Sequence, residues 1–396
     1  MKRLLMVLLC GMPAWAGEDV QKLADDNTAF ALDLFQQLRA APGNLFCSPY
    51  SISTALALTA GGARGETEKQ MAAALHFSLD RSRLHPAFAE LQATLNKIQK
   101  SGHVQLNVAN SLWPHKQHPF LADYLNLTRR CYGVEITAMD YAHAADAAGA
   151  TINRWVEAQT HDKIKNIIPS GTLDALTKLV LVNAIYFKGN WAHPFEKSAT
   201  QPAPFKLAGD KTVAAPLMGQ SREFRYAKAG GVQLLELPYA GDELSMLILL
   251  PEQAEGLAEL EKQLTVATVR EWTRQLRPRE VHVFLPRFKM TAQFELSRAL
   301  TALGMRDAFG GTADFSGMDG RRDLFISAIL HKAFVDVNEE GTEAAAATVV
   351  MMRELAMMEP PPTFRADHPF LFLIREKSTG SILFLGRVAD PTQAGE

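Results

Sequence analysis

The sequence predicts an α+β fold in which helices come first and long strands follow. Between residues 19 and 159, apolar residues recur at helical spacing in several segments, as in helices that bury one face. Beyond residue 179 the pattern changes to apolar runs separated by turn residues, which is typical of strands. The run LVLVNAIYF, residues 179–187, is almost continuously apolar. Such a strand is buried on both faces, so we expect other layers on both sides of its sheet.

The helices predicted from this periodicity come mainly early in the chain. The helix that starts at Ser48-Pro49 has a capping serine followed by a proline at the first helical position, and Gly61-Gly62 ends it. The predicted helical segments are residues 19–39, 48–59, 67–75, 88–98, 124–131, 142–159 and 294–303.

The predicted strands are residues 103–113, 179–187, 232–239, 244–251, 281–288 and 325–340, followed by a hairpin over 370–388 that turns at Ser378-Thr379-Gly380. A chain of 396 residues is long enough for two or more domains. However, no internal repeat, Pro/Gly/Ser-rich linker or low-complexity block divides it.

The first sixteen residues predict a signal peptide. Met1-Lys2-Arg3 is positively charged, residues 4–12 are apolar, and Ala14-Trp15-Ala16 is a small-x-small cleavage site. The apolar run is too short to span a bilayer. We expect cleavage after Ala16, with a retained membrane anchor as the alternative, and a secreted or periplasmic protein with no membrane partner.

The charge balance argues against one class of partner, and the cysteine content indicates how the core is stabilised. Removing Lys2 and Arg3 from the 41 basic residues leaves 39 against 43 acidic residues, a net charge of −4, which argues against nucleic acid. Cys47 and Cys131 remain after cleavage. Cys47 lies in an apolar run, so two buried free thiols are favoured over a disulfide. At 47% hydrophobic residues the chain can build its core by burial alone.

No common catalytic motif is present. The sequence contains no G-x-S-x-G, H-E-x-x-H, C-x-x-C or Walker-type loop. His115 and His118 are three residues apart, but no neighbouring carboxylate or third histidine completes a metal site. We interpret them as solvated loop histidines and expect no metal and no cofactor. An exported hydrolase whose catalytic groups meet only in space is an open alternative.

Four long segments resemble the signature segments of the serpins, the serine-protease-inhibitor superfamily. They are NLFCSPYSISTALALTAGGARGETEKQM, LVNAIYFKGNWAHPFEKSAT (followed by APLM), ILHKAFVDVNEEGTEAAAAT and FRADHPFLFLIREKSTGSILFLGRVADP. They occur in the family's order. The resemblance implies one domain over residues 17–396, with three β-sheets, about nine helices and an exposed reactive-centre loop at about residues 339–362.

The resemblance also implies a mechanism without enzymatic turnover. In inhibitory serpins a target protease cuts the loop, and the loop's N-terminal half inserts as a new strand into the central sheet. The protease is carried along as a trapped acyl-enzyme, and serpin loop insertion is itself a standard example of strand addition. A non-inhibitory serpin that acts as a binding or chaperone module is the alternative function.

The hinge of this loop has the composition that insertion requires. Because alternate strand residues share a face, one face would carry Thr342, Ala344, Ala346, Thr348, Val350 and Met352, and the other Glu343, Ala345, Ala347, Val349, Met351 and Arg353. The first set carries no charge and can be buried between sheet and covering helix, whereas the second set can face solvent. Gly341 would give the hinge backbone freedom. An alanine-rich surface helix is the alternative interpretation.

The family spacing places the cleaved bond about fourteen residues after Gly341, at Leu355–Ala356. Counting back from Pro369 gives Met358 instead, so Arg353, Met357 and Met358 are alternatives. Leucine or methionine suits chymotrypsin-like, elastase-like or cathepsin-like proteases, and arginine suits a trypsin-like protease.

The resemblance assigns two further groups of residues. Ser48, Ser51, Asn183 and His331 match the shutter, a polar cluster beneath the central sheet, and protonation of His331 would affect sheet opening. Trp191, Arg287 and Glu339 match the breach, where the loop enters, and Arg287 and Glu339 would form an ion pair. Arg81, Arg83, Lys97 and Lys100 are too scattered to predict glycosaminoglycan activation, and we expect a monomer.

Overall fold

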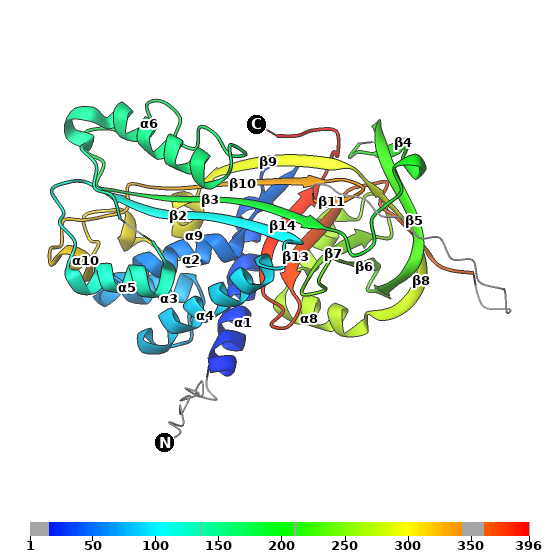
Figure 1. The fold of residues 1–396 in the computed structure, drawn as a ribbon, viewed down its shortest axis with the longest axis horizontal. Helices are drawn as coiled ribbons and strands as arrows, with labels where there is room; N and C mark the ends of the chain where they lie inside the picture. Colours follow the sequence, from blue (N-terminus) through cyan, green and yellow to red (C-terminus); the bar gives the residue numbers. More distant parts are fainter. Residues whose placement is uncertain (1–15, 135, 210, 343–359, 396) are drawn as a thin grey trace, which may run out of the picture.

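A computed structural model describes residues 16–134, 136–209, 211–342 and 360–395 of the chain. Residues 1–15 of the predicted signal peptide, the loop residues from Glu343 to Met358 and the bond Leu355–Ala356 lie outside these residues. In the described part, helices dominate the first 160 residues and strands dominate the rest, as the sequence predicts (Figure 1). None of these helices combines the length and apolar character that crossing a bilayer requires.

The helices of the described residues are α1 (Ala16–Leu38), α2 (Pro49–Ala60), α3 (Gly65–Ala74), α4 (Arg81–Gln99), α5 (Ala122–Tyr132), α6 (Tyr141–Gln159), α7 (Leu257–Gln263), α8 (Val266–Gln275), α9 (Ser297–Ala302), α10 (Ser316–Asp319) and the short 3-10 helices η1 (Lys197–Ala199) and η2 (Asp307–Phe309). Local capping explains two starts. Ser48 caps α2 by accepting a hydrogen bond from Ser51 N. Asp80 caps α4, so this helix begins seven residues earlier than periodicity predicts.

The strands are β1 (Leu45–Cys47), β2 (Val104–Pro114), β3 (Leu179–Asn190), β4 (Gln201–Lys206), β5 (Thr212–Ala229), β6 (Val232–Pro238), β7 (Leu244–Pro251), β8 (Arg277–Pro286), β9 (Phe288–Glu295), β10 (Ala328–Val337), β11 (Gly341–Thr342), β12 (Thr363–Arg365), β13 (Phe370–Glu376) and β14 (Ile382–Val388). The helix predicted over residues 294–303 is shorter than expected because β9 continues through Glu295.

By hydrogen bonding, the described strands form two sheets where the resemblance implies three. The larger has the order β1-β14-β13-β7-β6-β5-β8-β12, with β4 also on β5. The long strand β5 pairs with β4 at one end and with β6 at the other, and so joins two groups of strands into one bent sheet. Sequence periodicity missed β5 because charged residues such as Arg222, Glu223 and Lys228 interrupt its apolar positions.

The smaller, five-stranded sheet lies between two apolar layers, as the run at 179–187 predicts. Odd-numbered residues of β3, such as Leu181 and Ile185, join the main core with α2 and the larger sheet. Even-numbered ones, such as Val180 and Val182, pack against Ile152 and neighbouring residues of α6. Figure 1 shows α6 lying across the outer face of this sheet.

Two predictions about single side chains have opposite outcomes. Cys47 and Cys131 are both free and buried, as expected. The interpretation of His115 and His118 as solvated loop histidines is wrong, because each is only 3% exposed. The sequence analysis found no carboxylate close to these histidines along the chain, but folding places Asp319 against His118.

Candidate functional site: the seam of the five-stranded sheet

The centre of the five-stranded sheet is a parallel seam between β3 and β10. Their register runs from Val180 opposite Ala328 to Tyr186 opposite Phe334. Parallel pairing is slightly less stable per residue than antiparallel pairing. A strand that entered this seam from its end would run antiparallel to both neighbours.

The last two residues before the undescribed loop already occupy one end of this seam. After β10 the chain turns back through an Asn338–Gly341 bridge, and β11 pairs antiparallel with β3, Gly341 opposite Asn190 and Thr342 opposite Gly189. Val104 of β2 occupies the other side of β3 at Gly189. The chain therefore enters the loop from the β10 side of β3, at the end of the seam.

Gly341 is required here for two independent reasons. Its φ is +137°, a conformation that L side chains rarely adopt. A Cβ at this position would lie 2.2 Å from the Gly189 carbonyl oxygen and 2.6 Å from Asn190 Cα. Only glycine lets the hinge approach the backbone of β3 this closely.

Gly341→Ala is expected to destabilise the uncut protein by about 1–3 kcal/mol, because strained backbone and a displaced β11 both cost free energy. The measurement is the free energy of unfolding in urea. Gly310→Ala is the matched control, since φ at Gly310 is extended and a Cβ added there would have no other atom within 4 Å. Equal stability of the two variants would contradict this role of Gly341.

The four residues matched to the shutter meet beneath the seam. Ser48 N donates a hydrogen bond to His331 Nε2 at 3.1 Å, and His331 Nδ1 bonds Asn183 Oδ1 across the seam. Asn183 Nδ2 donates to Ser51 Oγ at 2.5 Å. The two serines lie at the start of α2, Asn183 lies on β3 and His331 lies on β10. The cluster therefore links β3 and β10, the strands that would separate, with the core beneath them.

Asn110 of β2 completes this cluster, and the sequence analysis missed it. Asn110 Oδ1 accepts from Ser51 Oγ at 3.3 Å and from Asn183 Nδ2. It lies opposite Asn183 in the β2–β3 register. The sequence signal was an asparagine among the core-facing positions of a strand, but only the register shows what it contacts.

The two hydrogen bonds of His331 define a neutral imidazole. Burial lowers its pKa to about 3, despite a smaller opposing effect of the hydrogen bond with Asn183. A proton on Nε2 would remove the acceptor of the Ser48 N–H bond and place a charge in the core. His331 is therefore neutral at pH 7, and its protonation affects the fold only under acidic conditions.

Lowering the pH from 7 to 5 is expected to destabilise the uncut protein partly through His331. Its folded pKa of about 3 is below the ordinary 6.5. The folded state thus binds fewer protons, and stability is complete above pH 6.5 and is lost as pH falls toward 3. The contribution is at most about 1.4 kcal/mol per pH unit.

The measurement is the pH dependence of Tm for the wild type and His331→Gln, which should show the shallower slope. His282→Gln, at an exposed position, is the control and should keep the wild-type slope. Indistinguishable slopes for wild type and His331→Gln would rule out the contribution.

The residues matched to the breach also come together, at the β11 end of the seam. Glu339 Oε2 lies 3.5 Å from Arg287 Nε, the expected ion pair, and Glu339 Oε1 accepts from Thr200 Oγ1 at 2.7 Å. Trp191 Nε1 donates to Asn338 O at 3.0 Å, and its ring stacks on Tyr239 at 4.7 Å between centroids. The turn that precedes the loop is thus held by side chains from several elements.

The chain matches the family model "Serpin (serine protease inhibitor)" over residues 25–391. The chain belongs to the serpin family. Among curated relatives, this serpin is 47% identical to the leukocyte elastase inhibitor of Bos taurus over 382 residues, 94% of this chain and 100% of the relative. It is 46% identical to the leukocyte elastase inhibitor of Homo sapiens, with the same coverage.

Solved structures show the same fold. Uncleaved ovalbumin is 32% identical with a TM-score of 0.84, covering 93% of this serpin and 100% of that chain. Human thyroxine-binding globulin complexed with thyroxine is 32% identical with a TM-score of 0.86, covering 95% of this serpin and 100% of that chain. A serpin from the insect Tenebrio molitor is 34% identical with a TM-score of 0.84, covering 93% and 98%.

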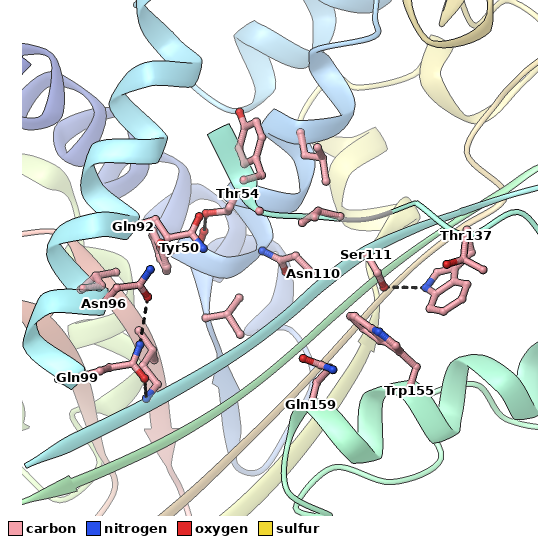
Figure 2. Close-up of a pocket in the computed structure, with 18 residues that line it drawn as sticks. Tyr50, Thr54, Gln92, Asn96, Gln99, Asn110, Ser111, Thr137, Trp155 and Gln159 are labelled. Carbon is pink, nitrogen blue, oxygen red and sulfur yellow. Dashed lines mark hydrogen bonds between the residues drawn. The ribbon is translucent and has the colours of Figure 1, made fainter. Parts of the chain in front are cut away.

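A polar cavity of about 500 Å³ lies beside the shutter (Figure 2). Its wall includes Asn110 and Ser111 of β2, whose side chains point to opposite faces of that strand, and Gln92 of α4. The cavity therefore wraps around β2, which pairs with β3 alone among the described strands.

Proposed function

We propose that this serpin is a suicide-substrate inhibitor of elastase-like serine proteases, with Leu355–Ala356 as the cleaved bond. The observation that carries the proposal is β11. The hinge is already paired with β3 at the end of the seam. The alternate residues that would share a strand face with Thr342, from Ala344 to Met352, carry no charge. Cleavage would release the rest of the strand to follow.

Extending the β11 register gives the expected position of each inserted residue. Since residues 341 and 342 lie opposite 190 and 189, Thr348 would lie opposite Asn183, which is itself opposite His331. Insertion would therefore replace the direct contact between Asn183 and His331 and bring a hydroxyl group into the shutter. A polar residue at position 348 suits a cluster whose groups all need hydrogen-bond partners.

The same register changes the assignment of the two strand faces. Even-numbered loop residues would point with Asn183 into the main core, and odd-numbered ones would point with Val182 toward α6. The covering helix therefore lies over the set that the sequence analysis assigned to solvent. The middle of that set, Ala345, Ala347, Val349 and Met351, is uncharged, so both faces can be buried.

The charged members of the odd set would lie at the ends of the new strand. Glu343 would be opposite Lys188, which is half-buried and lies beyond the α6 cluster. Arg353 would be opposite Lys178 at the other end. Charges at strand ends can reach water, and Glu343 gains an oppositely charged neighbour, so neither is stranded in the core.

The target class is supported by the relatives, which carry the name leukocyte elastase inhibitor. Leu355 also suits a protease with an apolar primary pocket. The test is incubation with elastase, chymotrypsin, a cathepsin and trypsin. We expect a denaturation-resistant complex with elastase, and mass spectrometry of the released C-terminal peptide identifies the bond. Cutting of the loop with continued protease turnover would contradict inhibition.

The alternative of a binding module is favoured by one similar structure, thyroxine-binding globulin complexed with thyroxine. A serpin that works only by binding does not need the inserted strand, so its activity would survive Thr342→Arg. The seam geometry supports inhibition more directly, because the hinge is paired at the site where insertion begins.

Export is proposed from the first sixteen residues. If the full chain is expressed in a host with a secretory pathway, N-terminal sequencing of the exported product should begin at Gly17. Recovery of the intact N-terminus from the cytoplasm alone would contradict a cleaved signal peptide.

A further inference from the structure

A second polar cluster lies at the end of the sheet opposite the breach. His118 is in the turn that follows β2, Asp319 is the last residue of α10, and Asp323 lies in the segment leading to β10. In Figure 1, α10 lies at the opposite end of the five-stranded sheet from β11. His118 is about 200 positions from the two aspartates in the sequence, and only folding brings it to them.

The three side chains converge at one point. His118 Nδ1 lies 2.7 Å from Asp319 Oδ2 and 3.9 Å from Asp323 Oδ1, and one potential ligand atom from each residue lies within 4.8 Å of the others. The side chains of His118 and Asp319 are 2% and 0% exposed, whereas Asp323 is 64% exposed. The cluster is thus a buried pair with a third carboxylate at its opening to solvent.

The surrounding structure fixes the two buried groups. Asp319 Oδ1 accepts from Arg321 N at 2.8 Å, which leaves Oδ2 directed at the imidazole. His118 N donates to His115 O at 2.9 Å, and the two rings pack edge to face. The Arg321 hydrogen bond is of the kind that orients carboxylate ligands in metal sites.

We propose that His118, Asp319 and Asp323 form a binding site for a zinc-class divalent cation. One imidazole nitrogen and two carboxylate oxygens are donors that zinc accepts, and three protein ligands leave the fourth tetrahedral position for water. Calcium prefers six to eight oxygen ligands and fits this set poorly. To bind the cation through Nδ1, the neutral His118 carries its ring proton on Nε2 instead of on Nδ1, from which it otherwise donates to Asp319.

The site would join the two sides of the seam. His118 is attached to β2, on the β3 side, and both carboxylates precede β10, on the other side. The same two segments are already linked by Leu121 N to Met318 O at 2.6 Å and Arg321 Nη1 to Gln117 O at 3.2 Å. The hydrogen bond between His118 and Asp319 is a third link; a cation would replace it with three metal–ligand bonds that also include Asp323, so it should stabilise the uncut sheet.

The experiment is zinc titration of the tag-free mature chain by calorimetry, with Tm measured in parallel. We expect one site per chain and a Tm that rises with zinc concentration. Asp323→Asn should weaken binding at least about tenfold and abolish the rise in Tm. Because Asp323 is exposed, this variant should fold normally without metal. Tetrahedral Co²⁺ absorption that is lost in Asp323→Asn would show direct ligation.

Asp123→Asn is the matched control, because it removes an exposed carboxylate five residues from His118 that is outside the cluster. It should bind zinc as the wild type does. Absence of binding would mean that the cluster is only a histidine–carboxylate hydrogen bond. Binding that Asp323→Asn leaves unchanged would mean that other histidines hold the metal. Either result overturns the proposal.

Discussion

Thr342→Arg is expected to convert this serpin from an inhibitor of its target protease into a substrate. The β11 register places residue 342 opposite Gly189, on the core-facing side of β3. Residue 342 already pairs there at the end of the seam in the uncut protein, and insertion of the residues that follow would close the seam over the new guanidinium, which would then be buried without a partner at a cost of about 3–5 kcal/mol. Insertion would slow by roughly a hundredfold or more, and hydrolysis of the acyl-enzyme would then occur first. The measurement is the number of inhibitor molecules consumed per protease inactivated.

Glu343→Arg is the matched control, because it places the same side chain one residue further on, on the opposite face of the strand. Position 343 would lie opposite the half-buried Lys188, near water, where the like-charge repulsion between the introduced arginine and Lys188 costs less than about 1 kcal/mol, far less than a buried unpaired guanidinium. This variant should trap the protease with a stoichiometry close to that of the wild type. Equal failure of both variants would show that any arginine in the hinge is harmful and that strand register does not explain the effect.

Cleavage of the loop is expected to raise Tm by about 10 °C or more. Insertion of roughly ten residues would replace the parallel β3–β10 ladder with two antiparallel ladders, a net gain of about ten backbone hydrogen bonds. At about 1 kcal/mol each, the gain is about 10 kcal/mol, and a chain of this size gains roughly 1 °C per kcal/mol. The measurement is calorimetry of the protein before and after limited proteolysis.

Cleaved Thr342→Arg provides the comparison for this measurement, since its loop is cut but its insertion is opposed. Its Tm should rise much less than that of the cleaved wild type. A wild-type Tm that does not change on cleavage would show that the strand does not insert, and the binding-module alternative would then be favoured.

Much of the candidate site was predictable because the information is local or carried by long motifs. The N-cap at Ser48 and the buried strand at 179–187 follow from short-range patterns. The breach pair Arg287–Glu339 and the shutter residues Ser48, Ser51, Asn183 and His331 were named from the family resemblance, and the structure brings each group together. The sequence analysis missed Asn110, Thr200 and Tyr239. The contact of Asn110 with Ser51 depends on strand register. Thr200 contacts Glu339 and Tyr239 contacts Trp191 only because folding brings distant segments to the turn before the loop.

The sequence by itself determined the order of helices and strands, the charge-free alternation of the hinge and the backbone freedom of the glycine before it. These depend on residue spacing and backbone freedom, which are local properties. Only the tertiary structure decided that both faces of an inserted strand would be covered, that His331 is neutral at pH 7, and that His118 meets Asp319 and Asp323. Burial and contacts between distant residues set these properties, and they exist only once the strands have paired and the core has closed.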